Sequence, residues 1–431
     1  MDTGMRAGAL LATGALTLAL ISATGTPAAA DTPKPRTTTE VDVHLDAATR
    51  NAAGDQTLLN TYRKYSCFEV EDPSIRDEYR AGADTRVPLT RMLDDLWYIG
   101  DRYVGQYILK TADGGFVLID SLNNSSEVTK YTIPALQALG MTAPSQLKGV
   151  ILSHGHGDHD GGASQLRALF GPDLPIYMGS ADAAGKTYAP TPIDSTDNKP
   201  QFITLGGTRI AAQSVPGHTP GSLVLFIPAH HNGHNVKLLV NGRGGIPTTA
   251  AGSRQYLQGT ERAYWAAKQL GATGTIHTHP LSDVSMRNID SVHANGTIDP
   301  YFLLGTQRTL RAAALWRECA AARAAQADPA ATIPVWRVTT VELPQRMPLT
   351  KQLSARVDSP WGPVPGQRVE FSAQGSKAGC VAITDQHGEA NCRSAITLRP
   401  RQKVTAKFAG NTSAEYVNLP SSGSAHVTVR D

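Results

Sequence analysis

The sequence predicts an α/β fold built of packed layers, followed by a C-terminal all-β sandwich. Two observations predict the layered part: a group of short apolar runs followed by helical segments occurs twice, and buried strands alternate with helices in the first group. A third observation predicts the sandwich, because short alternating runs recur at regular spacing beyond residue 334. A chain of 431 residues is long enough for two domains, each with its own core.

The first 30 residues have the pattern of a secretory signal peptide. Arg6 supplies a positive charge, residues 7–21 are apolar or small, and residues 28–30 are three alanines of the kind that signal peptidase prefers. The apolar run is shorter than the roughly 20 residues that a membrane span needs, so a membrane anchor is the weaker alternative. We therefore expect a secreted, extracellular protein without stable membrane insertion.

The four cysteines fit an exported protein. Cys67 and Cys319 lie far apart, whereas Cys380 and Cys392 lie close together in the C-terminal region. Neither pair has the spacing of a metal site, so we expect one disulfide across the large domain and one local disulfide. The alternative, four buried free thiols, is less common outside the cytoplasm, and spacing alone does not prove the connectivity.

The remaining elements follow in chain order, and we expect one domain over residues 31–333 and a second over 334–431. An amphipathic helix is expected over residues 46–65. The first layered group then has strands at 96–100, 106–111, 115–121 and 147–153, with helices at 126–140 and 161–171. The second group has strands at 202–207, 208–215, 222–228 and 236–241, followed by helices at 259–271, 283–294 and 304–326.

The C-terminal runs are typical of a β-sandwich of immunoglobulin type. The segments VPGQRVEFSA and AITDQHGEANC resemble bacterial immunoglobulin-like modules, in which a TDxxGxA pattern marks a hairpin between strands. Such modules act as spacers or bind cell-surface partners. The resemblance therefore implies a cell-surface partner for this region rather than a catalytic role.

The strongest chemical signal is SHGHGDHDGG, residues 153–162. It follows a predicted buried strand, and open α/β sheets place ligand sites at the carboxyl ends of strands. His154 and His156, two residues apart on an extended loop, point to the same side and can bind one metal ion together. Asp158 and His159 can face a neighbouring metal, and the two glycines that follow are expected to let the chain turn into the next helix.

Two histidines do not complete a catalytic zinc site, which usually has three protein ligands. The turn VPGHTPGS offers His218, held between prolines and glycines after a strand. The segment IHTHP offers His277 and His279 at another strand end for the second metal.

These motifs resemble the metallo-β-lactamase superfamily, most closely its third zinc β-lactamase subclass. The motifs that carry the resemblance are HGHGDHDGG, the turn GHTPGS and the dipeptide HP at residues 279–280. The resemblance covers roughly residues 96–325. It implies an αββα metallo-β-lactamase sandwich and two zinc ions per chain. The implied ligand sets are His154, His156 and His218 for the first zinc, and Asp158, His159 and His279 for the second.

Several nearby polar residues have competing interpretations. His279 is preferred to His277 because the family's most C-terminal metal-binding histidine tends to precede a proline. His277 is then either a strand residue or a residue that holds a metal ligand in place. Asp160 is expected to cap a helix or support a ligand rather than bind metal. Asp120 can orient a metal-bound histidine through its second nitrogen, or simply cap a strand end. The histidines of AHHNGHN are expected in a solvated hairpin loop.

The segment VKLLVNGRGGIP departs from the family's pattern. Many superfamily hydrolases carry a metal-bridging aspartate here, whereas this chain has Asn241. The third subclass also lacks that aspartate, so its absence here is compatible with two metal ions. That subclass commonly has serines in this loop, whereas this chain has Arg243 and two glycines. The resemblance therefore does not imply that the substrate is a β-lactam. Arg243 can bind a substrate carboxylate or phosphate, or be an exposed arginine. Tyr301 and Phe302 are candidates to line the pocket, with core packing as the alternative.

We therefore expect a secreted zinc-dependent hydrolase acting on a small-molecule substrate. A metal-activated hydroxide attacks an amide, lactam, ester or lactone carbonyl, and Asp158 orients the water and takes its proton. A β-lactamase is one form of this hypothesis, and a lactonase or esterase is the nearest alternative. The formal net charge of only +3 does not indicate the basic surface that binds the phosphates of nucleic acid, so we expect no nucleic-acid partner. A cell-surface binding protein with a vestigial metal site is the competing class, which the intact ligand set disfavours.

Overall fold

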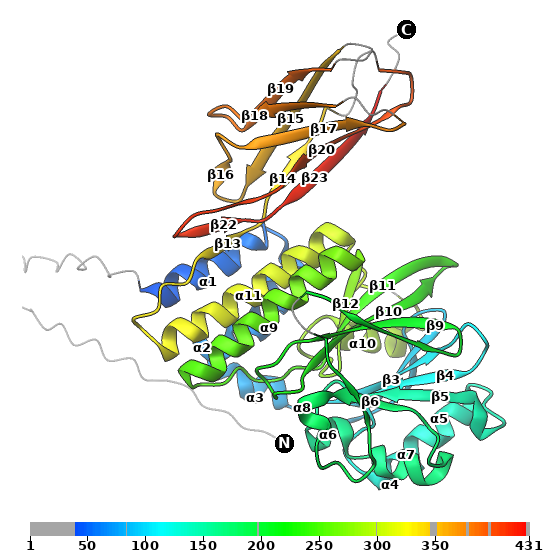
Figure 1. Ribbon diagram of the computed structural model, residues 1–431. Helices are drawn as coiled ribbons and strands as arrows, with labels where there is room; N and C mark the ends of the chain where they lie inside the picture. Colours follow the sequence, from blue (N-terminus) through cyan, green and yellow to red (C-terminus); the bar gives the residue numbers. More distant parts are fainter. Residues whose placement is uncertain are drawn as a thin grey trace, which may run out of the picture. The chain divides into compact units, whose positions relative to one another are not determined.

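The computed structural model describes residues 39–427 except for 83, 196–197, 299, 345–350, 376–378 and 395–397 (Figure 1). The predicted signal peptide and the end of the last predicted strand lie outside the described residues. No helix among the described residues is long and apolar enough to span a membrane.

The chain begins with helices that precede the first sheet: α1 (Glu40–Asn51), a π-helical segment (Leu58–Arg63), α2 (Lys64–Glu71) and α3 (Ile75–Arg80). A capping box between Thr39 and Asp42 starts α1. The single helix predicted over residues 46–65 is wrong, because the chain turns after α1. Ala53 and Gly54 have φ of 50° and 75°, in the left-handed region that ends helices.

The first sheet has seven strands in the order β1-β2-β3-β4-β5-β6-β7. Strands β1 to β4 form an antiparallel meander, and β4 to β7 are parallel to one another. The strands are β1 (Arg86–Arg91), β2 (Leu96–Asp101), β3 (Gly105–Lys110), β4 (Phe116–Ile119), β5 (Leu147–Ile151), β6 (Ile176–Gly179) and β7 (Thr191–Ile193). Strands β1, β6 and β7 were not predicted from the sequence.

Short helices connect the parallel strands. They are α4 (Ser125–Glu127), a π-helical segment (Val128–Thr132), α5 (Ile133–Ala138), a 3₁₀ turn (Pro144–Gln146), α6 (Gly157–Asp160), α7 (Ala163–Phe170) and α8 (Ser180–Ala183). The helix predicted over residues 126–140 is therefore present, with a π-helical turn inside it.

The second sheet has five strands in the order β12-β11-β10-β9-β8. These are β8 (Gln201–Leu205), β9 (Thr208–Ser214), β10 (Leu223–His231), β11 (His234–Asn241) and β12 (Gly274–His277), and only the β11–β12 pair is parallel. The hairpin of β10 and β11 turns at Asn232 and Gly233, as predicted for the histidine-rich segment. His230 lies on this hairpin and contacts Asp95 through Nδ1 at 2.6 Å.

Alternation along the strands separates the layers. Phe116 and Leu118 of β4 pack in a cluster with residues of α5 and α7, whereas Val117 and Ile119 join the cluster between the two sheets. Helices α9 (Ala250–Leu270), α10 (Ser285–Asn295) and α11 (Thr306–Ala327) follow the second sheet, and α9 packs against β9 and β10. The predicted αββα sandwich is confirmed (Figure 1).

Both disulfides are present as expected. Cys67 of α2 is bonded to Cys319 of α11, and Cys380 is bonded to Cys392. The first bond holds the N-terminal helices against α11, which also packs on α1 and α9.

The C-terminal region is all-β. Its strands are β13 (Val335–Arg337), β14 (Thr340–Glu342), β15 (Gln352–Ser359), β16 (Gly362–Pro363), β17 (Arg368–Ala373), β18 (Cys380–Ile383), β19 (Glu389–Arg393), β20 (Lys403–Phe408), β21 (Asn411–Thr412), β22 (Tyr416–Asn418) and β23 (Ser421–His426). Two sheets surround a separate hydrophobic cluster whose residues lie between Val341 and Val427. One sheet has the strand order β14-β15-β16, with β19 paired to β15, and the other has the order β18-β17-β20-β23. This arrangement is consistent with a β-sandwich, and its immunoglobulin type stays a prediction.

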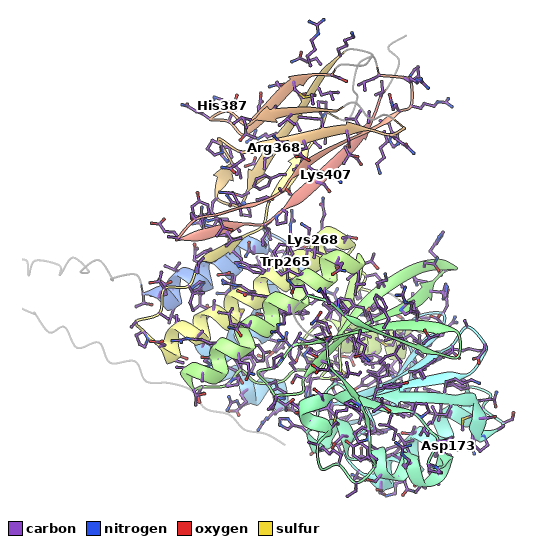
Figure 2. All side chains as sticks on the ribbon, in the orientation of Figure 1. Asp173, Trp265, Lys268, Arg368, His387 and Lys407 are labelled. Atoms are coloured by element: carbon purple, nitrogen blue, oxygen red, sulfur yellow. A yellow bond between two sulfur atoms is a disulfide. The ribbon has the colours of Figure 1, made fainter. Side chains whose placement is uncertain are left out.

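Two side chains of α9 contact the C-terminal segment (Figure 2). Trp265 packs edge-on against Trp336, and Lys268 donates a hydrogen bond to the carbonyl of Pro420. Trp336 belongs to the hydrophobic cluster of the layered domain. The domain boundary predicted at residue 334 stays a prediction, because residues 39–431 form one compact unit.

Candidate metal centre

The candidate ligands converge at the ends of strands from both sheets. His154 and His156 lie on the loop after β5, and Asp158 and His159 lie in α6, which begins directly after His156. His218 lies on the turn between β9 and β10. The sixth candidate, His279, follows β12.

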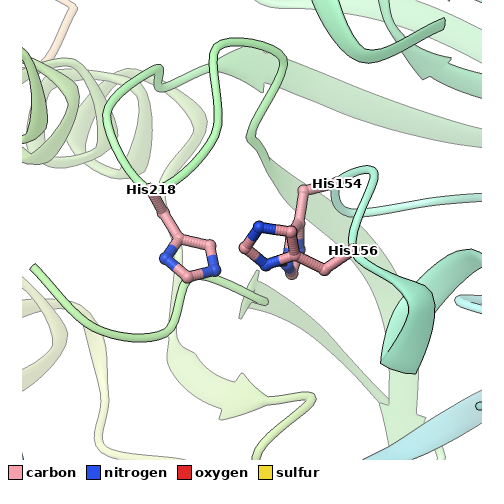
Figure 3. A group of neighbouring side chains, drawn as sticks. All are labelled: His154, His156 and His218. Atoms are coloured by element: carbon pink, nitrogen blue, oxygen red, sulfur yellow. Dashed lines mark hydrogen bonds between the residues drawn. The ribbon is translucent and has the colours of Figure 1, made fainter. Parts of the chain in front are cut away.

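The first set brings three histidine rings together (Figure 3). His154 Nε2 lies 3.2 Å from His156 Nδ1, and the ring of His218 lies 4.7 Å from each of the other two rings, between centroids. The ligand atoms of the three side chains all lie within 4.8 Å of one another. Three imidazole nitrogens at this spacing match the donor set of a catalytic zinc site.

The second set lies directly beside the first. Asp158 Oδ2 is 3.6 Å from His159 Nε2 and 3.8 Å from His279 Nε2, and these two nitrogens are 3.1 Å apart. His154 also lies within 4.8 Å of Asp158 and His159, counting ligand atoms, so the two sets adjoin. The assignment of all six residues as zinc ligands stays a prediction.

In four of the five histidines, Nδ1 has a partner outside the two sets, which leaves Nε2 to bind metal. Nδ1 of His154 contacts Ser153 Oγ at 3.1 Å, and Nδ1 of His159 contacts Asp120 Oδ2 at 2.7 Å. In the other two histidines Nδ1 contacts a backbone carbonyl oxygen. His218 Nδ1 lies 3.1 Å from the oxygen of Gly245, and His279 Nδ1 lies 2.9 Å from that of Tyr103. Such contacts fix the tautomer and the orientation of a metal-binding imidazole.

Burial favours the neutral, metal-binding form of most of these histidines. Burial, together with the neighbouring imidazoles, lowers the pKa of His154 well below its ordinary value. Burial likewise lowers the pKa of His218 to about 4 and that of His279 to about 3. For His159 burial opposes protonation, but the Asp120 carboxylate outweighs it and the pKa is raised.

Asp182 of α8 connects the two ligand loops and was not among the predicted site residues. Its carboxylate accepts hydrogen bonds from the backbone N–H of Gly155 at 2.8 Å and of Gly221 at 2.8 Å, and from the Thr219 hydroxyl at 2.5 Å. Gly155 lies between His154 and His156, and Thr219 follows His218. No local pattern marks Asp182, because its partners are distant in the chain.

The two glycines after the motif have a different role from the one expected. Gly161 and Gly162 keep ordinary helical or near-helical dihedrals, with φ of −59° and −89°. A Cβ on Gly161 would lie 2.0 Å from the carbonyl oxygen of Asn123, and one on Gly162 would lie 2.1 Å from that of Ser121. The glycines are therefore required by close backbone packing rather than by the turn itself.

The residues with competing interpretations are also placed. His277 is buried, and its Nδ1 accepts the backbone N–H of His279 at 2.9 Å, so it supports the loop that carries His279. Asp160 accepts hydrogen bonds from Lys186 at 2.5 Å and Tyr188 at 2.7 Å and belongs to neither set. Asp120 contacts His159, as the sequence analysis anticipated.

A cavity of about 310 Å³ opens beside His279. Its wall combines the loop after β11 with helices α2, α3, α9 and α11, and it contains aromatic side chains that the sequence analysis did not identify. These are Tyr65, Phe68, Tyr103, Tyr256 and Trp316. Arg243 also lines the cavity and is not the exposed arginine of the alternative interpretation, because only 3% of it is exposed.

The substrate-binding role of Tyr301 stays a prediction. Its ring packs 3.9 Å from the guanidinium carbon of Arg287, and it is absent from the described residues that line the cavity. Its neighbour Phe302 is fully buried in the core. This segment packs beside α10, where the backbone N–H of Tyr301 bonds to Asn288.

Part of the chain is similar to known proteins. Residues 100–231 match the family model of the metallo-β-lactamase superfamily. A hydroxyacylglutathione hydrolase of Shewanella halifaxensis is 35% identical over 123 residues, which are 28% of this chain and 39% of that protein. One from Yersinia pestis is 35% identical over 77 residues, 18% of this chain and 28% of that protein. The chain thus matches less than half the length of these curated relatives.

Two metallo-β-lactamases of known structure are similar to part of the chain. A subclass B3 enzyme of Bradyrhizobium japonicum is 19% identical with a TM-score of 0.40, over 54% of this chain and 92% of that chain. A metallo-β-lactamase in a complex with mercaptoacetic acid is 17% identical with a TM-score of 0.46, over 56% of this chain and 98% of that chain.

Proposed function

We propose that the chain is a zinc-dependent hydrolase of small molecules, because residues 100–231 match the family model of the metallo-β-lactamase superfamily. The observation that carries this proposal is the pair of adjoining ligand sets, His154, His156 and His218 beside Asp158, His159 and His279. Five of these six residues lie inside the matched region, and His279 lies beyond it.

The donor atoms fit zinc better than a hard cation. The first set offers three imidazole nitrogens and the second offers two with one carboxylate, whereas Mg²⁺ and Ca²⁺ prefer oxygen ligands. The contacts of Nδ1 with Ser153, Asp120, Gly245 and Tyr103 favour the tautomer with the proton on Nδ1, so that Nε2 of the neutral ring can bind metal. We therefore propose two zinc ions per chain.

Zinc bound at these sets supplies Lewis acidity, which lowers the pKa of water toward neutrality and polarises a carbonyl. The chain's own groups then position the reactants. Asp158 is partly exposed, and its ligand atom lies within 4.8 Å of those of His154 in the first set and His159 in the second, so it orients the attacking water and accepts its proton. Asp120 holds His159 in place from the opposite side. No serine or cysteine nucleophile is needed.

The substrate we propose is a compound with an amide, lactam, ester or lactone carbonyl. A cavity of about 310 Å³ is of the size that accepts a small molecule. A second candidate reaction is hydroxyacylglutathione hydrolysis, which is favoured by the 35% identity to proteins of that name. A β-lactam is the first substrate class to test.

We also propose that the protein acts outside the cell. Two disulfides support this location, because such bonds persist in oxidising compartments. The C-terminal β region contains no metal-binding cluster among its described residues, so its proposed role is to contact a cell-surface partner.

The test is to measure zinc per mature chain together with turnover of a chromogenic cephalosporin, before and after chelation. We expect about two zinc ions and chelator-sensitive turnover that returns with zinc. His279→Ala should then lose the second zinc, while His231→Ala on the hairpin should keep both. Two zinc ions without lactam turnover redirect the search to the other carbonyl classes, beginning with hydroxyacylglutathione. A chain that binds no zinc overturns the proposed function.

A further inference from the structure

Glu69 of α2, two residues after the disulfide-bonded Cys67, lies beside the loop that follows β11. Its Oε2 accepts the backbone N–H of Ile246 at 2.9 Å, and only 12% of its side chain is exposed. Two arginines flank the carboxylate, with Arg76 Nη2 3.5 Å from Oε1 and Arg323 Nη2 3.7 Å from Oε2. Nη2 of Arg323 also donates to the backbone carbonyl of Glu69 at 2.9 Å. Glu69 is therefore fixed both through its side chain and through its backbone.

The N–H that Glu69 accepts belongs to the same peptide group as the carbonyl that contacts His218. That carbonyl is the one of Gly245, whose oxygen lies 3.1 Å from His218 Nδ1. Because a carbonyl oxygen can only accept, Nδ1 is the donor and Nε2 is left to bind metal. A trans peptide group is planar, so its N–H and C=O point to opposite sides. Glu69, the peptide group and His218 are thus linked by two hydrogen bonds in series.

The two glycines of this loop allow a close approach on both of its sides. A Cβ on Gly245 would lie 2.9 Å from Glu69 Oε1, and one on Gly244 would lie 3.1 Å from His218 Cε1. The Tyr256 hydroxyl of α9 donates to the carbonyl of Gly244 at 3.3 Å. The loop is therefore in direct contact with both the acid and the imidazole.

This link resembles the direct contact of Asp120 with His159 in the second set, with one peptide group inserted. Hydrogen bonds in series polarise one another, so a carboxylate on the N–H makes the carbonyl oxygen of the same peptide group a stronger acceptor. A stronger bond at Nδ1 fixes the ring and raises the basicity of the nitrogen that binds metal. A carboxylate one peptide group away can therefore strengthen a histidine ligand that it does not touch.

We propose that Glu69 is a positioning residue for the first ligand set, acting on His218 through the Gly245–Ile246 peptide group. The inference rests on the proposed zinc-dependent function and adds to it a residue outside both ligand sets. Glu69 lies outside the matched residues 100–231, so the N-terminal helices do more than line the cavity. They also set the affinity of the metal centre.

The test titrates zinc into the metal-free protein in competition with a chromophoric chelator, which gives a dissociation constant for each zinc. We expect Glu69→Ala to weaken one of the two constants about 10- to 100-fold, as the loss of a group that supports a ligand does, and to leave the other unchanged. Glu69→Gln keeps an oxygen that accepts the Ile246 N–H, so it should recover most of the lost affinity. Glu71→Ala is the matched control and should change neither constant, because this acid of the same helix pairs with Arg63 instead.

The affected zinc is assigned in the His279→Ala background, in which the second set is broken. Glu69→Ala should cause the same loss there, because the remaining zinc is bound by the first set. If Glu69→Ala binds both zinc ions like the wild type, or weakens both equally, the positioning role is overturned while the hydrolase function stands.

Two further outcomes are also decisive. If Glu69→Gln is as weak as Glu69→Ala, the acid acts through its ion pairs rather than through the peptide group, and the proposed link is overturned. If the loss in Glu69→Ala is present but no carbonyl compound is hydrolysed, the hydrolase function fails and the positioning role stands.

Discussion

Asp283 shows how a single buried acid affects the protein's response to pH. It is 3% exposed, its Oδ1 accepts the backbone N–H of Ser285 at 2.8 Å, and Oδ2 has no partner among the described residues. Burial raises its pKa to about 7, against the opposing hydrogen bonds from Ser285. The folded chain therefore keeps a proton on Asp283 over a pH range in which the unfolded chain has lost it.

The sign of the pH effect follows from this raised pKa. Between about pH 4 and pH 7 the folded state binds more protons than the unfolded state, so the free energy of unfolding falls as pH rises. Asp283→Asn removes this contribution and should be more stable than the wild type by a few kcal/mol at pH 8 but not at pH 4, because one pKa unit corresponds to about 1.4 kcal/mol. Urea unfolding of both metal-free proteins at the two pH values checks this, with the exposed Asp46→Asn as control. Parallel pH profiles for Asp283→Asn and the wild type would contradict it.

At the scale of elements, the disulfide between α2 and α11 joins the N-terminal helices to the layered domain. Cys67 and Cys319 are fully buried, and α2 places Tyr65 and Phe68 in the wall of the cavity. The bond closes a sequence separation of 252 residues, against 12 for Cys380 and Cys392. In the chain-entropy model these loops contribute about 5 and about 3 kcal/mol to the free energy of unfolding.

Removing each disulfide should therefore have different effects. The double substitution of Cys67 and Cys319 by serine should lower the thermal midpoint more than that of Cys380 and Cys392, because the loop is longer and the bond is buried. It should also raise KM, because α2 no longer holds its side of the cavity. Calorimetry and steady-state kinetics on both variants test this. Equal KM values in the two variants would show that the cavity wall does not depend on the bond.

At the scale of the whole molecule, the largest hydrophobic cluster and the cluster of the C-terminal region are separate, and the candidate metal ligands lie in the layered domain. The larger cluster extends from α1 through both sheets to Trp336 and Leu419, whereas the C-terminal cluster begins at Val341. Glu318 of α11 connects the parts around the first cluster. Its carboxylate accepts the backbone N–H of Trp336 at 2.9 Å and contacts His44 of α1 at 2.6 Å.

Zinc removal should accordingly act on one part of the molecule. Zinc at about 100 times its Kd stabilises the folded layered domain by about 2.7 kcal/mol, which corresponds to a shift in Tm of about 5 to 10 °C. Chelation should lower the calorimetric transition of the layered domain by this amount and leave that of the C-terminal β region unchanged. A chelator that shifts neither transition, or both equally, would contradict this assignment of the metal to the layered domain.

The sequence by itself determined the order of the layers and the chemistry of the ligands. Strand alternation, helical spacing and the run from His154 to His159 are local properties, so they can be read without knowing which segments meet. For the same reason the hairpin at Asn232 was predicted from its residues. The contact of Asp120 with His159 was anticipated because an acid at a strand end beside a metal motif commonly supports a ligand.

Only the tertiary structure decided what surrounds the ligands. Sheet pairing and the packing of α2, α9 and α11 fix which distant residues share one cavity, and no local pattern encodes those distances. The structure shows Asp182 as the link between the ligand loops. It also shows that Arg243 is buried and has no ion pair among the described residues. A side chain's burial and charge balance depend on segments far away in the chain, so these properties emerge when the elements pack together.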